Sequence, residues 1–270
     1  MNTDTDPTPT ADERGRPVTA PALLSGALSR LRARPDVPSI LVLAGIVVAG
    51  TDWLRARSPV PVTEYNRFRT GDLNVAFELL VSVLPRNVLS PSALLGLQPR
   101  WLVVTVGLEL FSFVTAVGAC AYALATLLDT DLSVGIVARY GVLLAALRVG
   151  APQITFTGGS ILIGLPLLAA VLYVVVSLVP LPGRLVLGES LVTALRRSWG
   201  QTGGYGWSLF GVVLLLGLAN DLLASVPLVS PVGSAVVAAV HAGVVAAFLA
   251  RTDGQQPRGR TPAPTAAPAD

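Results

Sequence analysis

Long apolar segments alternate along the chain with shorter polar stretches. A helix needs roughly 20 apolar residues to cross a bilayer core of about 30 Å. Six segments approach or reach this length, and we therefore expect six membrane-spanning helices. The four strongest are Trp101–Leu128, Ser160–Leu181, Tyr205–Val226 and Pro231–Ala250; the two weaker ones are Ser39–Leu54, which contains Asp52, and Ser133–Val149, which contains Arg139 and Arg148.

Two shorter apolar stretches lie outside these six segments. Ala22–Arg34 is apolar on one side and places its Arg residues toward its C-terminal end, where cations suit the helix dipole and anionic lipid. Leu73–Leu84, in the long first loop, is an apolar run of the length expected of an interfacial or re-entrant helix. We expect both stretches to form short helices.

The stretch Glu189–Gln201 joins the fourth and fifth apolar segments and separates two kinds of side chain. On a helix of about 100° per residue, its apolar side chains fall within an arc of about 100°. The apolar side chains are Leu191, Val192, Leu195 and Trp199, and the opposite side carries Glu189, Thr193, Arg196, Arg197 and Gln201. This pattern predicts an amphipathic helix that lies on the inner membrane face. A plain polar connector is the alternative.

Both ends of the chain are polar. Residues 1–20 are acidic and contain several Pro residues, and residues 252–270 consist mainly of Gly, Gln, Pro, Thr and Ala. Neither has enough apolar surface to offset the entropy of ordering, so we expect two disordered tails. Residues 21–251 form the predicted membrane domain.

Composition supports a membrane protein and gives it an orientation. The chain is 52% hydrophobic and 13% charged, with a mean hydropathy of +0.67, whereas about a quarter of the residues of soluble domains are charged. The basic residues are all Arg and are scattered at segment ends, so no nucleic-acid partner is expected. With both termini inside, eleven Arg residues face the inner side and six the outer side. We therefore expect an all-α, multi-pass protein of the cell membrane with cytoplasmic termini.

A single acidic residue within the second segment is the main candidate for chemistry. Glu109 lies eight residues into that segment, and a carboxylate inside the membrane is a functional-site hypothesis by default. Arg148 is its first expected partner and Arg139 its second. One interpretation is structural: an ion pair, or a protonated Glu109 hydrogen-bonded to a neighbouring helix. The other is a small transporter that uses Glu109 together with a helix interrupted at Pro166.

An enzyme hypothesis rests on a serine and a histidine. Ser160 at the start of the fourth segment and His241 on the sixth resemble the dyad of rhomboid-type intramembrane proteases, in which His activates Ser. Ile161 stands where that motif has a second Gly, and His241 is the only His of the chain. No Cys, His, Asp and Glu residues have metal-ligand spacing, so we expect no metal or other cofactor.

The Glu189 region also carries a family resemblance. The pattern GES, ALRRSW and WSLFG follows a long apolar segment interrupted by Pro; its matching residues are Glu189, Ala194, Leu195, Arg196, Arg197, Ser198, Trp199, Trp207 and Phe210. It resembles an uncharacterised family of six-helix membrane proteins, similar to the membrane domain attached to some glycerophosphodiester phosphodiesterases. The resemblance covers about the C-terminal 100 residues. It implies a six-helix fold without an established activity, and the chain contains no phosphodiesterase catalytic domain.

The sequence therefore favours a non-enzymatic membrane protein, either an accessory subunit or a lipid-associated scaffold. Its expected partners are membrane lipids and other membrane proteins. A small transporter is the second hypothesis, and the rhomboid-like protease is the third.

Overall fold

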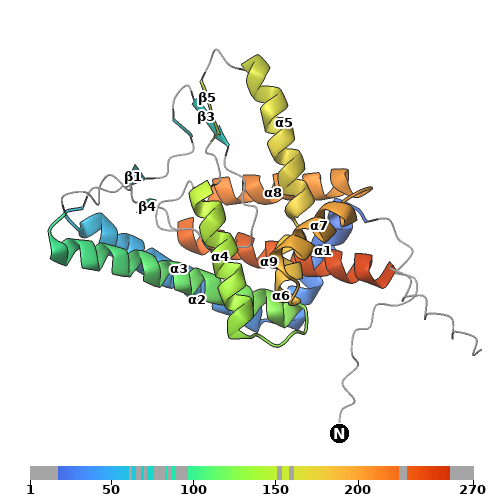
Figure 1. The fold of residues 1–270 in the computed structure, drawn as a ribbon, viewed down its shortest axis with the longest axis horizontal. Coiled ribbons are helices and arrows are strands. Elements are labelled where there is room, and N and C mark those ends of the chain that lie inside the picture. The colour runs from blue at the N-terminus through green and yellow to red at the C-terminus, as the bar shows by residue number, and fades with distance from the viewer. Residues whose placement is uncertain are drawn as a thin grey trace, which may run out of the picture.

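The computed structural model describes residues 18–60, 63–64, 68–69, 72–75, 83, 87–88, 97–150, 154–157, 161–224 and 230–255. These residues are predominantly helical (Figure 1). The helices are α1 (Ala20–Ala33), α2 (Asp36–Arg57), α3 (Pro99–Leu127), α4 (Val134–Gly150), α5 (Ile161–Leu178), α6 (Leu181–Val186), α7 (Leu191–Gln201), α8 (Gly206–Ala224) and α9 (Ser230–Gln255). The strands are β1 (Thr63–Glu64), β2 (Phe68–Arg69), β3 (Asp72–Val75), β4 (Asn87–Val88) and β5 (Ile154–Thr157).

Each of the six predicted apolar segments forms a helix, namely α2, α3, α4, α5, α8 and α9. By length and composition, four helical segments can cross a membrane: α2, α3, Ala169–Val186 and Ser230–Asp253. A fifth is added if α7 and the Gly206–Asn220 part of α8, which meet at 109°, form one broken span. The apolar part of α4, Val134–Leu147, is shorter than the others. The fold is therefore compatible with a helical membrane protein of four or five spans.

The first loop contains strand where a helix was expected. Asp72–Val75 forms β3, so the prediction of a helix starting at Leu73 is wrong at its start. β3 pairs antiparallel with β2 and with β5, in which Ile154 lies opposite Val75. β-Branched residues in both strands favour extended backbone, and a paired partner can override a local apolar pattern. Most of the remaining stretch, residues 76–82 and 84, lies outside the described residues.

The described residues extend a short way into both predicted tails, to Val18 at one end and Gln255 at the other. Val18 is buried and Thr19 caps α1 by accepting a hydrogen bond from the Ala22 N–H. At the other end α9 continues to Gln255, and the Thr252 hydroxyl donates to the Phe248 carbonyl within its last turns. Residues 252–255 are therefore helical; Thr252 hydrogen-bonds within the helix, and Asp253 is held by Arg184 and Gln201. Residues 1–17 and 256–270 lie outside the described residues.

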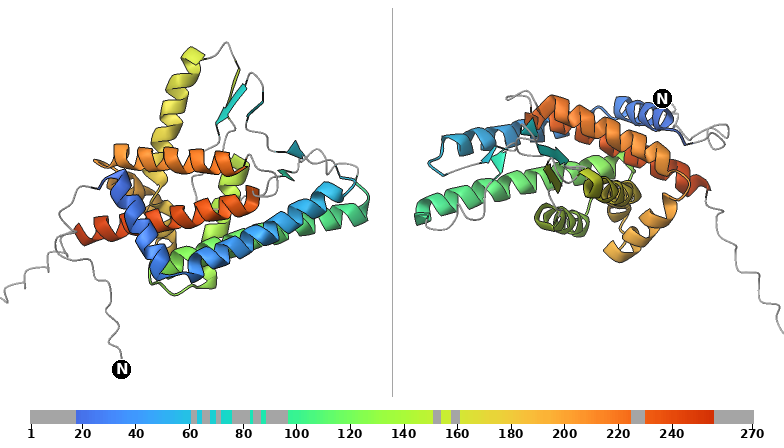
Figure 2. Two further views of the ribbon diagram at one scale, coloured as in Figure 1. Left: turned by 180° about the vertical axis from the view of Figure 1, so that it is seen from behind. Right: turned by 90° about the horizontal axis from the view of Figure 1, so that it is seen from above.

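Helix α9 is the most enclosed of the apolar helices, with α1, α2 and α8 packed along it (Figure 2). Small residues allow these backbones to approach closely. A Cβ on Gly45 of α2 would lie 2.9 Å from both the Ala235 Cβ and the Pro231 carbonyl oxygen, and one on Gly243 would lie 2.9 Å from the Ala27 Cβ. Such contacts are typical of helix packing in membranes, where small side chains bring backbones together.

The outward faces of several helices are strongly apolar. On α3 only a narrow strip, which includes Thr105, Ser112 and Ala116, is buried along its first turns, while seven large apolar side chains are exposed. These are Leu102, Val103, Val104, Val106, Leu110, Phe111 and Val114. A soluble protein rarely exposes so continuous an apolar surface, and a lipid environment removes its cost.

Candidate functional site: two buried arginine networks

The first network is centred on Arg184 in the short helix α6. Pro180 precedes this helix and Pro182 lies in its first turn, where a missing N–H costs nothing. The Arg184 side chain is only 4% exposed. Its Nη1 donates to Glu189 Oε1 at 3.1 Å, its Nη2 donates to Asp253 Oδ1, and its Nε donates to Gln201 Oε1 at 3.2 Å. One guanidinium therefore joins α6 to the turn before α7, to the end of α7 and to the end of α9.

Glu189 lies just before α7 and not within it. Ser190 is the N-cap, and its hydroxyl accepts from the Thr193 N–H, so the helix begins two residues later than the sequence pattern predicts. Glu189 Oε1 accepts from Arg184 and, at 2.5 Å, from Arg197 Nη1. The hydrogen bond to Glu189, together with its charge, raises the pKa of Arg197. Glu189 therefore acts here as a structural link between two arginines.

Helix α7 presents three different surfaces. Ala194 and Ser198, one turn apart, are fully buried against the protein. Val192 is 70% exposed and Trp199 43% exposed, as part of an outward apolar face that also includes Leu191 and Leu195. Arg196 and Arg197 are both exposed. The predicted amphipathic helix is confirmed as a helix with segregated faces; its place on a membrane surface stays a prediction.

The arginines around this corner have different contacts. Arg197 is paired with Glu189. Arg139 of α4, predicted as a second partner of Glu109, donates from Nη1 to the Gly188 carbonyl at 3.1 Å and so braces the turn between α6 and α7. That turn needs Gly188, whose φ of +87° is costly for other residues. Arg196 has no ion pair within the part of the chain that the structure describes.

The second network lies between α2 and α3 and is centred on Arg55. The Arg55 side chain is 2% exposed, and its Nη2 lies 2.8 Å from Glu109 Oε2 while its Nη1 donates to Asp52 Oδ1 at 3.1 Å. Nη2 also lies within hydrogen-bond distance of the Leu108 carbonyl and the Ser112 hydroxyl. Two carboxylates and one guanidinium are therefore held inside an apolar helix pair.

The structure thus gives Glu109 a partner that the sequence did not suggest. Arg55 was placed in the loop after the first span, and α2 extends far enough to include it. Arg148, the partner expected first, lies in α4, but its side chain is outside the described residues and this pairing stays a prediction. The Glu109 side chain is 33% exposed, so Glu109 lies at the edge of the network and Arg55 lies buried behind it.

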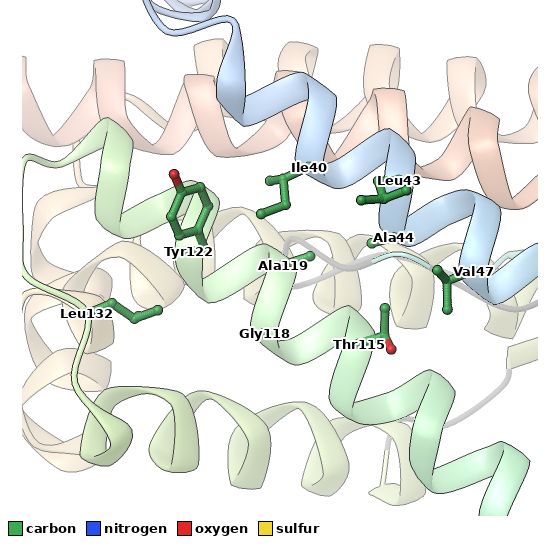
Figure 3. Close-up of a pocket in the computed structure, with 9 residues that line it drawn as sticks. All are labelled: Ile40, Leu43, Ala44, Val47, Thr115, Gly118, Ala119, Tyr122 and Leu132. Atoms are coloured by element: carbon green, nitrogen blue, oxygen red, sulfur yellow. The ribbon is translucent and has the colours of Figure 1, made fainter.

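An apolar groove runs beside the same helix pair, nearer its other end (Figure 3). Its volume is about 380 Å³, and Thr115 and Tyr122 are the polar residues that line it. The Tyr122 hydroxyl donates to Asp36 Oδ2 at 3.3 Å. The apolar lining residues are Ile40, Leu43, Ala44, Val47, Gly118, Ala119 and Leu132. The groove offers apolar contact and no cluster of groups suited to catalysis.

The proposed protease dyad is only partly described. His241 is buried in α9, 6% exposed, and its Nε2 has no hydrogen-bond partner among the described residues. Ser160 lies outside the described residues. Within the described part of the chain, no three His, Cys, Asp or Glu side chains lie together in a way that could hold a metal ion.

Comparison with known protein families, curated proteins and solved structures found no match to this chain. The resemblance to the six-helix membrane family therefore stays an expectation drawn from the Glu189–Phe210 motif.

Five charged or amide residues of the two networks were missed from the sequence. Asp52 was placed in a span without a role, and Arg55, Arg184, Gln201 and Asp253 were assigned to loops, a polar helix face or a tail. A signal was present for three of them. Asp52 and Arg55 are spaced three residues apart, as in a helical ion pair, and Arg184 interrupts the apolar hexapeptide LPGRLV. The contacts of Gln201 and Asp253 depend on tertiary structure alone.

Proposed function

We propose that the chain is a six-span integral protein of the cell membrane with both termini in the cytoplasm. It serves as a non-enzymatic, lipid-associated membrane component or as an accessory subunit of a membrane complex. The spans are α2, α3, α4, α5 with α6, α8 and α9. Helix α7 lies on the inner surface between the fourth and fifth spans.

Contacts on the inner side support this topology. Arg34, before the first span, has its Nη2 2.6 Å from Asp129 Oδ1 in the loop after the second span. Arg251, at the end of the sixth span, donates from Nη2 to the Ala22 carbonyl at 3.0 Å. Each pair joins two segments that six spans place on the cytoplasmic side.

Contacts on the outer side likewise join segments that the six-span topology assigns to the same side of the membrane. Strand β3 belongs to the first outer loop and β5 to the second, and the two strands pair along four residues. Arg55 and Glu109 lie at the outer ends of the first and second spans and form an ion pair. None of these contacts would join an inner segment to an outer one, which supports six crossings including the short helix α4.

The exposed apolar face of α7 is the observation that carries the functional proposal. Val192 is 70% exposed, and Trp199 stays 43% exposed beside Tyr173 of α5, while Ala194 and Ser198 anchor the other flank of α7. The bend of 109° between α7 and α8 suits a surface helix followed by a span. A helix that keeps such a face uncovered is built to contact lipid or a membrane partner.

A small transporter is the second candidate, and the Arg55 network favours it. Charged groups inside a membrane are rare and mark transport pathways when they line an aqueous route. Here Glu109 is one-third exposed, while Asp52 and Arg55 are buried beside it. The same network is also explained as a structural tie between α2 and α3.

Native mass spectrometry of the full chain, gently extracted from its own membrane, tests the proposal. We expect phospholipid to remain bound in stoichiometric amounts, and a stoichiometric protein companion would assign the accessory role. A chain that carries neither lipid nor protein would contradict the proposal. Extraction from the membrane by alkaline carbonate would contradict the integral topology itself.

A further inference from the structure

Arg196 occupies a special position on α7, at the border between its apolar and polar sides. At about 100° per residue, Arg196 lies about 40° from Val192 and about 60° from Trp199. Arg196 is therefore about one helical turn after Val192 and one turn before Trp199. A basic residue at this border can bury its stem along apolar surface while its charged end reaches the headgroup layer.

The neighbouring arginine points elsewhere. Arg197 lies about 100° further round the helix and donates to Glu189 at 2.5 Å. Arg184 is buried in its own network, and Arg139 donates to the Gly188 carbonyl. Of these four arginines, Arg196 alone makes no hydrogen bond or ion pair with the described residues.

The apolar face beside Arg196 continues onto a membrane-spanning segment. Trp199 contacts Tyr173 of α5 edge to face, with ring centroids 5.5 Å apart, and Tyr173 is 60% exposed. Tyr173 belongs to the candidate span Ala169–Val186. The surface next to Arg196 is therefore continuous with the exposed side of a candidate membrane span.

The local charge is positive. Around the α6–α7 corner, contacts join Arg139, Arg184 and Arg197 to the Gly188 carbonyl and to two carboxylates, Glu189 and Asp253. Arg196, next to Arg197 on α7, adds a fourth cation, so these described residues carry two positive charges more than negative ones. A zwitterionic headgroup would place its own cation beside these arginines. An anionic headgroup carries no cation and is therefore the better electrostatic match.

We infer that Arg196, flanked by Val192 and Trp199, binds the phosphate of an anionic glycerophospholipid in the inner leaflet. The inference rests on the proposed function, because it names the class of lipid that α7 contacts. The guanidinium donates to phosphate oxygens, and the two apolar side chains lie against the upper part of the acyl chains.

Lipid competition on the full-length protein tests this inference. The protein is reconstituted in nanodiscs with equal amounts of phosphatidylglycerol and phosphatidylcholine, and native mass spectrometry measures the ratio of the two lipids that stay bound. We expect Arg196→Gln to lower the preference for phosphatidylglycerol about fivefold, from about 1 kcal/mol per basic residue near an anionic surface. Arg196→Lys should keep most of the preference.

Arg57→Gln is the charge-matched control, because Arg57 is exposed at the outer end of α2, over the Trp53 ring. It should lower the preference less than Arg196→Gln does, because the Arg57 guanidinium already lies 3.6 Å from the centroid of the Trp53 ring. The inference is overturned if the wild type shows no preference, or if Arg57→Gln lowers it as much as Arg196→Gln. A wild type that incorporates and retains lipid without preference leaves the proposed function standing. Failure to incorporate contradicts the proposed function and this inference together.

Discussion

Replacing Arg184 with Met lowers the free energy of unfolding by about 3 kcal/mol, the lower end of the 3–5 kcal/mol typical of a broken buried ion pair. The change removes the cation that joins Glu189 to Asp253 among the described residues. Glu189 keeps its ion pair with Arg197, and Asp253 keeps the hydrogen bond from the Gln201 amide, so neither carboxylate loses every partner. The lower end applies because the Asp253 side chain is 37% exposed and can be hydrated. Reversible unfolding in mixed micelles, followed by circular dichroism, measures the loss.

Two further variants make this prediction specific to the network. Arg196→Gln, in the same corner but exposed, should change the stability by no more than about 0.5 kcal/mol. Adding Asp253→Asn to Arg184→Met should restore part of the loss, since one unpaired carboxylate is then removed. Equal stability of Arg184→Met and Arg196→Gln would show that the network contributes nothing.

Replacing Arg55 with Met is expected to cost about 3 kcal/mol as well, by the same mechanism. Asp52, whose side chain is 7% exposed, and Glu109 would lose their shared cation inside the α2–α3 pair. The hydrogen bond from Arg55 to the Leu108 carbonyl would also be lost. The same unfolding experiment measures the effect.

Arg57→Gln, two residues further along α2, is the matched control and should be nearly neutral because Arg57 is exposed. The double variant Arg55→Met with Glu109→Gln should be more stable than Arg55→Met alone. If the second change adds a further loss instead, Glu109 has a role that does not depend on Arg55, and the structural interpretation of this network is wrong.

Helix positions could be predicted well from the sequence because each apolar segment is long and bounded by polar or Pro residues. The amphipathic pattern of Glu189–Gln201 likewise predicted α7, and only its start differs, since Ser190 caps the helix. The strand at Asp72–Val75 was not predicted, although one of its partners, β2, lies only a few residues before it; the other, β5, is about 80 residues away in the chain. Local apolar pattern alone does not distinguish a short helix from a paired strand.

The contacts of the charged residues were much harder to predict. Glu109 was recognised as important from its place in an apolar segment, but its partner Arg55 lies on another helix. Arg196 and Arg197 are adjacent and chemically identical, so the sequence assigned them one role. The structure separates them, because Glu189 pairs with Arg197.

The central claim is that the outer end of α2 and the surface helix α7 lie on opposite sides of one membrane. Cysteine labelling tests it directly, because Cys120 is the sole cysteine and is buried. In a Cys120→Ala background, single cysteines replace Arg57 or Gly200, and a Cβ at Gly200 would meet no neighbouring atom. A membrane-impermeant maleimide should label position 57 in intact cells and position 200 only after permeabilisation. Labelling of both positions in intact cells would contradict the topology and the membrane role proposed for α7.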